Sequence, residues 1–264
     1  MSSPPDTPPS GTCTRRRLLV AAGALAAVAG ACGTPDAATP NHPAAAVDPI
    51  MDDFGDLPFP RTTLAGAATR LAASTEDPAI FHHSMRTYLY GRVLGRRQGV
   101  EPGRDYDDEL LYLGCVLHDL GLGTRGTGAG RFELDGADLA RQFAVDNGVP
   151  AGRADIIWDA VTLHTSPDIA ERKRPEIGLV SLGAGFDLGG DPAALPAGYS
   201  GHVHRWLPRL HAAVALHDTI VAQAVNRPEK APPFTLAGEL VRQQTGTAWP
   251  SWRDIAGSPG WGDY

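Results

Sequence analysis

Cysteine is scarce in this chain, with three among its 264 residues. Cys13 and Cys32 lie close to the N-terminus, so Cys115 alone falls in the region with regular helical periodicity. A single cysteine cannot form a disulfide within that region, and packing must hold the fold together instead. Cys115 stands in an apolar run, which predicts a small buried core residue.

Positive charge is also in short supply. The chain has 23 Lys and Arg against 30 Asp and Glu, a net charge of −7 with histidine neutral. Nucleic-acid-binding domains carry a basic patch, whereas the basic clusters here, at 96–97 and 172–174, are short enough to be solvated helix ends. The glycine-rich segment 121–130 lacks the Lys-Ser/Thr ending of a phosphate-binding loop. We therefore expect no nucleic-acid partner and a small-molecule substrate.

Long apolar runs are missing as well. The longest, from Val20 to Ala31, is shorter than the ~20 residues that a membrane-spanning helix needs. It follows Arg15, Arg16 and Arg17 and ends in small residues, which is typical of an export signal. The paired arginines before two leucines resemble a twin-arginine signal, which exports folded proteins. The sequence thus predicts an exported protein with a signal over residues 1–31.

The end of this signal has two interpretations. Ala29 and Ala31 fit the small-residue site of ordinary signal cleavage, which gives a secreted protein. Cys32 fits the lipidated cysteine of a cell-envelope lipoprotein, and this interpretation is favoured because a Gly/Pro/Ala-rich tether follows it. The lipid at Cys32 would then be the only link to a membrane. A flexible tether is expected over 32–60 and one domain over 61–264.

Strand signals are poor, because β-branched runs are few and no alternation is sustained. Apolar residues recur instead at spacings of three and four, which predicts a single all-α domain with a helical-bundle core. The aromatic tail 249–264, with Trp249, Trp252 and Trp261, is expected to cap that core. The predicted helices cover residues 65–74, 78–97, 107–119, 135–148, 151–163, 175–187, 205–226 with a break at Pro208, and 235–245.

Three of these predicted helices carry an inward-facing histidine. His118 and Asp119 close the helix 107–119, His83 and His164 lie on two others, and Asp187 stands alone in an apolar stretch. Any one of these histidines could be a satisfied core residue, but buried charges are rare unless they pair or bind metal. Imidazole and carboxylate ligands suit Zn²⁺, Fe²⁺ or Mn²⁺, and the absence of thiolates argues against a structural zinc. The cluster predicts one divalent metal, zinc or iron.

The order of these residues, His83, His118-Asp119 and Asp187, resembles the HD-domain superfamily. Several short sequence motifs resemble those of its cyanamide hydratase-like branch: HSMRTY at 83–88, RFELDGAD at 131–138, LHTS at 163–166, and PEI at 175–177 with GFD at 185–187. The resemblance implies an all-α, metal-dependent hydrolase with a mononuclear metal site in the core. It also implies four metal ligands: His83, His118, Asp119 and Asp187.

The resemblance further implies how the site would work. The metal acidifies a water molecule, which adds to the carbon of a small nitrile and gives urea from cyanamide. The two catalytic residues would be His164 and Asp119. His164 would be a further metal ligand or the proton donor to the nitrile nitrogen. Arg86 would bind an anionic substrate or, as we favour, pair with an acid such as Glu133. Glu133 and Thr165 would orient ligands or substrate, and Asp135 is favoured as a helix cap.

Two alternatives stay open at this point. One is an HD-type phosphohydrolase, for which Arg86 and Arg131 are the only basic residues near the ligands. The other is a cell-envelope lipoprotein that keeps the fold without activity. His202 and His204 have a spacing with no strong metal meaning, and His82 is expected at the surface or behind a ligand. The hydratases that this chain resembles are intracellular, so export of this chain would leave its natural substrate open. Whether the protein forms a homo-oligomer also stays open.

Overall fold

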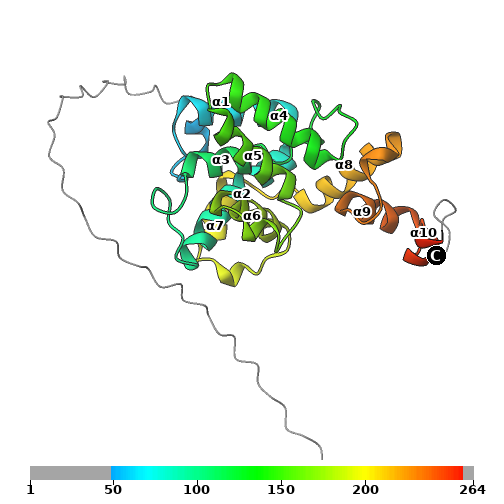
Figure 1. Ribbon diagram of the computed structural model, residues 1–264. Helices are drawn as coiled ribbons and strands as arrows, with labels where there is room; N and C mark the ends of the chain where they lie inside the picture. Colours follow the sequence, from blue (N-terminus) through cyan, green and yellow to red (C-terminus); the bar gives the residue numbers. More distant parts are fainter. Residues whose placement is uncertain (1–48, 258–264) are drawn as a thin grey trace, which may run out of the picture. The chain divides into compact units, whose positions relative to one another are not determined.

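A computed structural model describes residues 49–257, which contain helices and no strand (Figure 1). The all-α prediction is confirmed for this part of the chain. The predicted signal, Cys32, the tether up to residue 48 and Trp261 lie outside the described residues. Among the described helices, none has the length and apolar character required to cross a membrane.

The sequence pattern predicted most helices to within a few residues. The prediction for 78–97 matches α2 at both ends, and that for 151–163 matches α5. The α-helices in chain order are α1 Thr63–Thr75, α2 Pro78–Arg97, α3 Asp108–Val116, α4 Phe132–Asp146, α5 Ala151–Leu163, α6 Pro175–Gly189, α7 Tyr199–Trp206, α8 Ala212–Asn226, α9 Leu236–Thr245 and α10 Trp252–Ala256. Short 3₁₀ helices are η1 Pro49–Phe54, η2 Leu120–Leu122, η3 Ala170–Arg172, η4 Pro192–Ala194 and η5 Pro228–Lys230.

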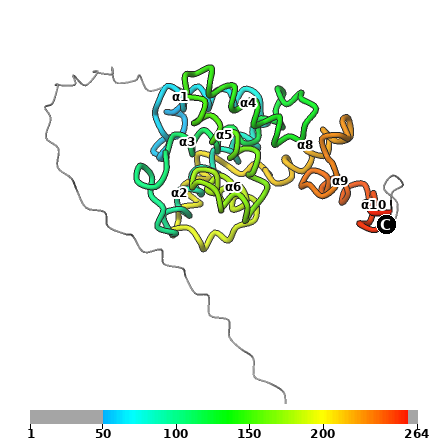
Figure 2. The backbone as a smooth tube through the Cα atoms, viewed as in Figure 1, coloured from blue at the N-terminus to red at the C-terminus, as the bar shows by residue number. Residues whose placement is uncertain are grey.

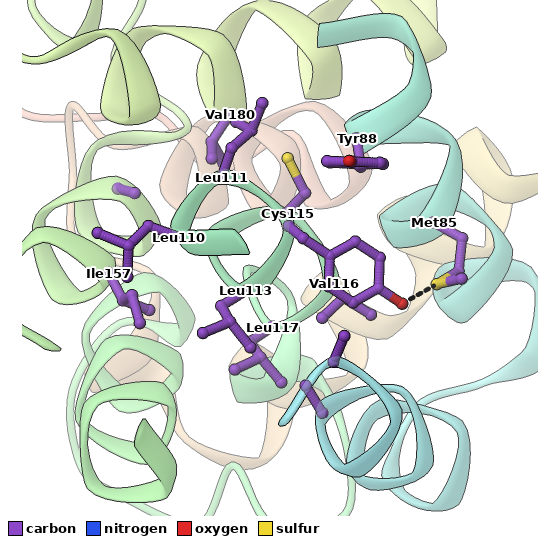
Figure 3. Close-up of a cluster of buried hydrophobic side chains, with 14 of the residues drawn as sticks. Met85, Tyr88, Leu110, Leu111, Leu113, Cys115, Val116, Leu117, Ile157 and Val180 are labelled. Atoms are coloured by element: carbon purple, nitrogen blue, oxygen red, sulfur yellow. Dashed lines mark hydrogen bonds between the residues drawn. The ribbon is translucent and has the colours of Figure 1, made fainter. Parts of the chain in front are cut away.

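Helix α3 lies at the centre of the core and is buried on every side. Its first turn is fixed by Asp107, whose side chain accepts hydrogen bonds from the backbone N–H groups of Glu109 and Leu110. Figure 3 shows its apolar side chains, Cys115 among them, directed toward α2, α5 and α6. Cys115 is fully buried, which confirms its predicted core role. A helix that is apolar all round is one that neighbours enclose completely.

Helices α2 and α6 pack along one another over most of their length. Glycines allow the close approach, because a Cβ added at Gly183 would lie 2.2 Å from the carbonyl oxygen of Thr87, and one at Gly91 2.7 Å from that of Leu179. Asp77 caps α2 and Pro78 occupies its first turn, which starts the helix where the pattern predicted. This packing sets the α2 histidine opposite the α6 aspartate.

The predicted tether extends too far into the fold. Met51, Phe54, Leu57 and Phe59 are buried, and the two phenylalanine rings meet edge to face. Segment 49–60 therefore belongs to the core. Its 3₁₀ turn and following extended residues show no 3.6-residue period, and its Pro and Asp content matches that of a linker.

Two C-terminal predictions need correction. The predicted break at Pro208 is confirmed, because residues 207–211 form an irregular link between α7 and α8 in which Leu210 and His211 have positive φ, but the first helix begins at Tyr199 and not at residue 205. The aromatic tail does not cap the core: Trp252 is 77% exposed, and Trp249 packs on Phe234 and Arg242 beside α9. Figures 1 and 2 place α9 and α10 to one side of the α2–α6 pair.

Candidate metal centre

Three histidines reach one point from three different elements. His83 lies inside α2, His118 lies two residues beyond the end of α3, and His164 directly follows α5. The prediction that all three stand on helices is therefore wrong for His118 and His164. Each of these two occupies a helix C-terminus, where backbone carbonyl groups lack partners.

Each ring is fixed through its Nδ1 atom. His118 Nδ1 lies 2.7 Å from the carbonyl oxygen of Cys115, and His164 Nδ1 lies 2.6 Å from that of Val161, both three residues earlier. His83 Nδ1 lies 2.7 Å from Asp187 Oδ2. Because all three partners are acceptors, Nδ1 carries the proton, and Nε2 keeps its lone pair for a metal.

The three Nε2 atoms converge on the carboxylate of Asp119. The Nε2 atoms of His83 and His118 are 3.3 Å apart, and Asp119 Oδ2 lies 3.2 Å from His118 Nε2 and 3.8 Å from His83 Nε2. His164 Nε2 lies 3.7 Å from Asp119 Oδ1. Donor atoms of His83, His118 and Asp119 all fall within 4.8 Å of one another.

This donor set fits one divalent cation. Asp119 Oδ2 is buried and accepts no hydrogen bond. The Nε2 atoms of His83 and His118 face each other, and neither carries a proton to donate to the other. Such buried atoms are costly unless a cation satisfies them. The negative ends of the α3 and α5 dipoles also point to this position and favour positive charge there.

Asp187 faces the back of His83 instead of its Nε2 side. Its carboxylate accepts from Arg86 Nε and Nη2, each at 2.8 Å, from His83 Nδ1 and from Arg209 Nη1 at 3.2 Å. A carboxylate behind a ligand histidine fixes the ring and raises its basicity. The assignment of Asp187 as a fourth ligand is a prediction that this arrangement does not support.

Burial controls the protonation of the site. It lowers the pKa of His83 and lowers that of His164 to about 4, with the His118 charge adding to the effect on His164. Burial acts on His118 in the same direction, but the adjacent Asp119 carboxylate outweighs it and raises its pKa. Burial alone would raise the pKa of Asp119, yet the imidazoles lower it. As the pH falls, His118 is therefore protonated before His83 and His164, and a bound metal would compete with that proton.

Comparison with known proteins places this geometry in a family. Residues 80–194 match the family model of the HD domain. The chain carries an HD domain. HD domains are a family of metal-dependent hydrolases and bind divalent metals. The resemblance to this family is confirmed.

Two curated relatives share part of this sequence. Cyanamide hydratase DDI2 and cyanamide hydratase DDI3 of Saccharomyces cerevisiae are each 29% identical to the chain over 111 residues. The match covers 41% of this chain and 48% of each relative, so the chain spans about half the length of the curated relatives it matches.

The HD domain surrounds the donor set with a further polar layer. Glu133 is fully buried in the first turn of α4, where Arg131 Nη2 donates to it at 2.6 Å and Thr165 Oγ1 at 2.9 Å. The expectation that Arg86 pairs with an acid is confirmed, but the acid is Asp187 instead of Glu133. Arg86 and Asp187 are 101 residues apart in the sequence, so no local sequence pattern indicates that they pair.

Asp135 is not a helix cap. Helix α4 begins at Phe132, three residues before Asp135, so the predicted start at 135 is too late. The Asp135 carboxylate instead accepts from Lys230 Nζ at 2.5 Å and from the Gly130 N–H at 3.1 Å. Both charged groups are buried, and Lys230 gave no signal in the sequence because it lies in a Pro- and Ala-rich turn.

Glu76 is a buried acid near the centre that sequence reasoning missed. Burial raises its pKa, and the charge of Asp119 adds to this. Ser84 Oγ donates to its Oε2 at 3.3 Å, while Oε1 is buried without a hydrogen bond. Nothing in the sequence around Glu76, which directly precedes the α2 cap Asp77, indicates that it is buried.

Three further histidines, His82, His202 and His204, lie away from the centre. His82 Nδ1 lies 3.1 Å from the carbonyl oxygen of Pro208, and His204 Nε2 lies 3.0 Å from Tyr90 Oη. His202 Nε2 lies 3.1 Å from the exposed carboxylate of Asp56. The structure therefore brings together His83, His118, Asp119 and His164 and leaves His82, His202 and His204 outside.

A cavity of about 330 Å³ opens onto the donor set. Its polar lining is formed by the site residues with Thr165, Ser181 and His217, and the rest of its lining is mostly apolar. Among the described residues that line it there is no Lys or Arg. The full lining is His83, His118, Asp119, Phe132, His164, Thr165, Pro167, Ser181, Ala184, Gly185, Leu188, Ala213, Leu216, His217, Ile220, Leu236 and Leu240.

Proposed function

We propose that this protein is a metal-dependent hydratase of the HD type that adds water to the carbon of a small nitrile, as in the conversion of cyanamide to urea. One observation carries the proposal: three imidazole Nε2 atoms and an unbonded Asp119 oxygen meet at the end of a cavity that, among the described residues, no Lys or Arg lines. Zinc or iron is the proposed metal, because both accept imidazole and carboxylate together.

The proposed ligands are His83, His118 and Asp119, with His164 completing the set or facing it across a water molecule. When bound, a divalent cation lowers the pKa of a coordinated water to about 7 and polarises the substrate. The chain keeps its donor atoms ready for this role, because Cys115, Val161 and Asp187 hold the three Nδ1 protons away from the centre.

His164 is the proposed carrier of the proton in this reaction. Its Nε2 has a free lone pair at neutral pH, since burial lowers its pKa to about 4. It can accept a proton from water and return it to the nitrile nitrogen as the C–O bond forms. The Thr165 hydroxyl donates to Glu133, so its oxygen is free to accept an N–H of the substrate.

A phosphoester substrate is the weaker alternative. Phosphate recognition needs cationic donors in the site. Arg86 is fully engaged by Asp187 and by the carbonyl oxygens of Leu207 and Pro208, and Arg131 pairs with Glu133. A protein that keeps the fold without activity would have no use for an unbonded buried carboxylate oxygen, which argues against the non-catalytic alternative.

Metal content and urea release test the proposal. The parent protein is expected to hold one metal per chain by mass spectrometry and to release urea from cyanamide, and His118→Ala is expected to lose both. His202→Ala is the matched control, because its ring pairs with Asp56 away from the site. Metal without urea, but with release of phosphate from phosphoesters, would favour the phosphohydrolase. Absence of bound metal in the parent would refute the enzyme.

A further inference from the structure

The cavity is larger than a small nitrile requires. Cyanamide has three non-hydrogen atoms and occupies roughly 90 Å³ if each takes the ~30 Å³ share of a water molecule in the liquid. The cavity holds about 330 Å³. The excess corresponds to at most roughly eight further atoms on the same scale. A site that served only cyanamide would leave most of this space to water against apolar walls.

The cavity lining combines polar and apolar groups. The polar groups come from the donor set, Thr165, Ser181 and His217, whereas the apolar groups include Leu216 and Ile220 of α8 and Leu236 and Leu240 of α9. Leu216 and Ile220 are buried and belong to an apolar cluster with Ile80. Binding sites with one polar end and an apolar body fix a reactive head group and select the remainder of the ligand by shape.

The part of the apolar lining that α8 and α9 supply, called the wall below, comes from outside the matched family region. Helices α8 and α9 follow residue 194, where the HD match ends. Three side chains attach them to the glycine-rich segment 121–130: Gln223 donates to Gly121, Arg227 to Thr127 and Lys230 to Gly126. These contacts hold the wall against the HD domain, so the apolar space is a formed part of the fold.

We infer that the substrate is a neutral nitrile whose carbon bears an apolar group of roughly six to eight carbon atoms, such as a phenyl or hexyl group, lying between α8 and α9. This inference rests on the proposed function for the reacting nitrile group. One O–H bond of water breaks and a C–O bond forms at the nitrile carbon. The nitrogen gains that proton, and the resulting imidic acid rearranges to a primary amide without any oxidant or reductant.

Binding of the product amides tests the apolar part without turnover. Calorimetry on the metal-loaded protein with acetamide, butanamide and hexanamide is expected to show affinity rising about fourfold for each added methylene. In parallel, kcat/KM is measured for cyanamide and benzonitrile. Benzonitrile is expected to be the better substrate by at least tenfold.

Variants of the wall provide the specific test. Ile220→Trp and Leu240→Trp fill the cavity from α8 and α9 and are expected to weaken hexanamide binding and benzonitrile turnover more than tenfold. Val214→Trp is the matched control, because Val214 is 58% exposed on α8 and does not line the cavity. Should a tryptophan prevent folding, Leu240→Ala is expected to weaken hexanamide severalfold without affecting urea binding.

The outcomes separate this inference from the proposed function. Flat affinities across the amides, with cyanamide as the better substrate, would overturn the apolar substituent and leave the hydratase in place. Rising affinities that the wall variants abolish, with no nitrile hydrated, would overturn the hydratase and keep the apolar ligand. Rising affinities with benzonitrile turnover, both lost only in the wall variants, would support the whole inference.

Discussion

The contrast between Asp119 and Asp187 shows how two buried aspartates of the same helical core differ in role. Asp119 has an oxygen without a hydrogen bond facing three Nε2 atoms, whereas the oxygens of Asp187 are filled by Arg86, Arg209 and His83. A carboxylate with every lone pair occupied is a poor metal ligand but a strong orienting group. The sequence predicted the residue types of the site, but it could not predict that Asp119 faces the metal position while Asp187 orients His83.

Asp187→Asn is therefore expected to weaken metal binding about 10- to 100-fold without abolishing it, because it loosens the His83 ring but removes no donor atom. Asp119→Asn is expected to abolish stoichiometric binding. A competition titration with a chelator measures both affinities. The absorption spectrum of cobalt-substituted protein provides the check, since unchanged ligand-field bands are expected in Asp187→Asn. Altered bands would identify Asp187 as a ligand.

The stability of the metal-free protein should depend on pH through the same histidines. The pKa of His164 is about 4 when folded, below the ~6.5 of an unfolded chain, so the unfolded state binds the proton first. Stability is then lost as pH falls from about 6.5 toward 4, by on the order of 3 kcal/mol at most. His118 has a raised pKa and contributes the opposite slope above pH 6.5.

Urea denaturation of the metal-free protein between pH 8 and pH 4.5 measures this dependence. A maximum near pH 6.5 is expected, with a decline on the acid side that is smaller in His164→Gln. An acid decline of equal size in both proteins would show that His164 is not responsible.

At the scale of elements, the α2–α6 contact decides how accurately the site is built. Gly183→Ala would place a Cβ 2.2 Å from the Thr87 carbonyl oxygen, so the helices must separate by a fraction of an ångström or more. We expect a loss of about 1–3 kcal/mol in stability, together with weaker metal binding, since His83 and Asp187 lie on the two separated helices. Thermal unfolding and metal titration measure the two effects.

Gly185→Ala is the control for that substitution. It lies on the same helix, and an added Cβ would meet nothing within 4 Å. Alanine is the better helix former by about 1 kcal/mol, so the melting temperature is expected to stay the same or rise. A similar loss in both variants would mean that the close approach of the helices is not what Gly183 provides.

Periodicity predicted the elements best where a helix has both a cap and an amphipathic or buried stripe. Helix α2 has Asp77 and Pro78 at its start, and α9 has Thr235 as its cap, so their limits were readable. The end of α3 was predicted too late because its apolar run continues up to His118 and Asp119, whereas the helix itself ends at Val116. Segment 49–60 was missed because 3₁₀ and extended residues carry no helical period.

The whole molecule, as the sequence predicts it, is exported and held at a membrane through Cys32, a residue outside the described part. Membrane retention through lipid depends on the buried acyl chains, at about 0.8 kcal/mol per methylene. Cys32→Ser is therefore expected to move the protein from the membrane fraction to the soluble fraction, while Cys13→Ser leaves it in place. Immunoblots of the separated fractions measure this. A parent protein that is already soluble outside the cell would favour ordinary signal cleavage and secretion.

A buried ion pair between Lys230 and Asp135 joins the C-terminal segment that carries the wall to α4. Lys230→Met leaves Asp135 charged, buried and without its cation, so a loss of about 3–5 kcal/mol is expected. Lys230→Met combined with Asp135→Leu removes both charges and is expected to recover most of that loss. Chemical denaturation of the four proteins gives the coupling between the two sites.

The same four proteins connect the wall to the site. If the pair holds α8, η5 and α9 against the HD domain, Lys230→Met should weaken hexanamide binding more than metal binding, because the donor atoms come from α2 and from the ends of α3 and α5. The double variant should restore hexanamide binding along with stability. Equal losses of metal and amide binding would instead mean that Lys230 stabilises the domain as a whole, and that the wall and the metal centre do not behave as separable parts.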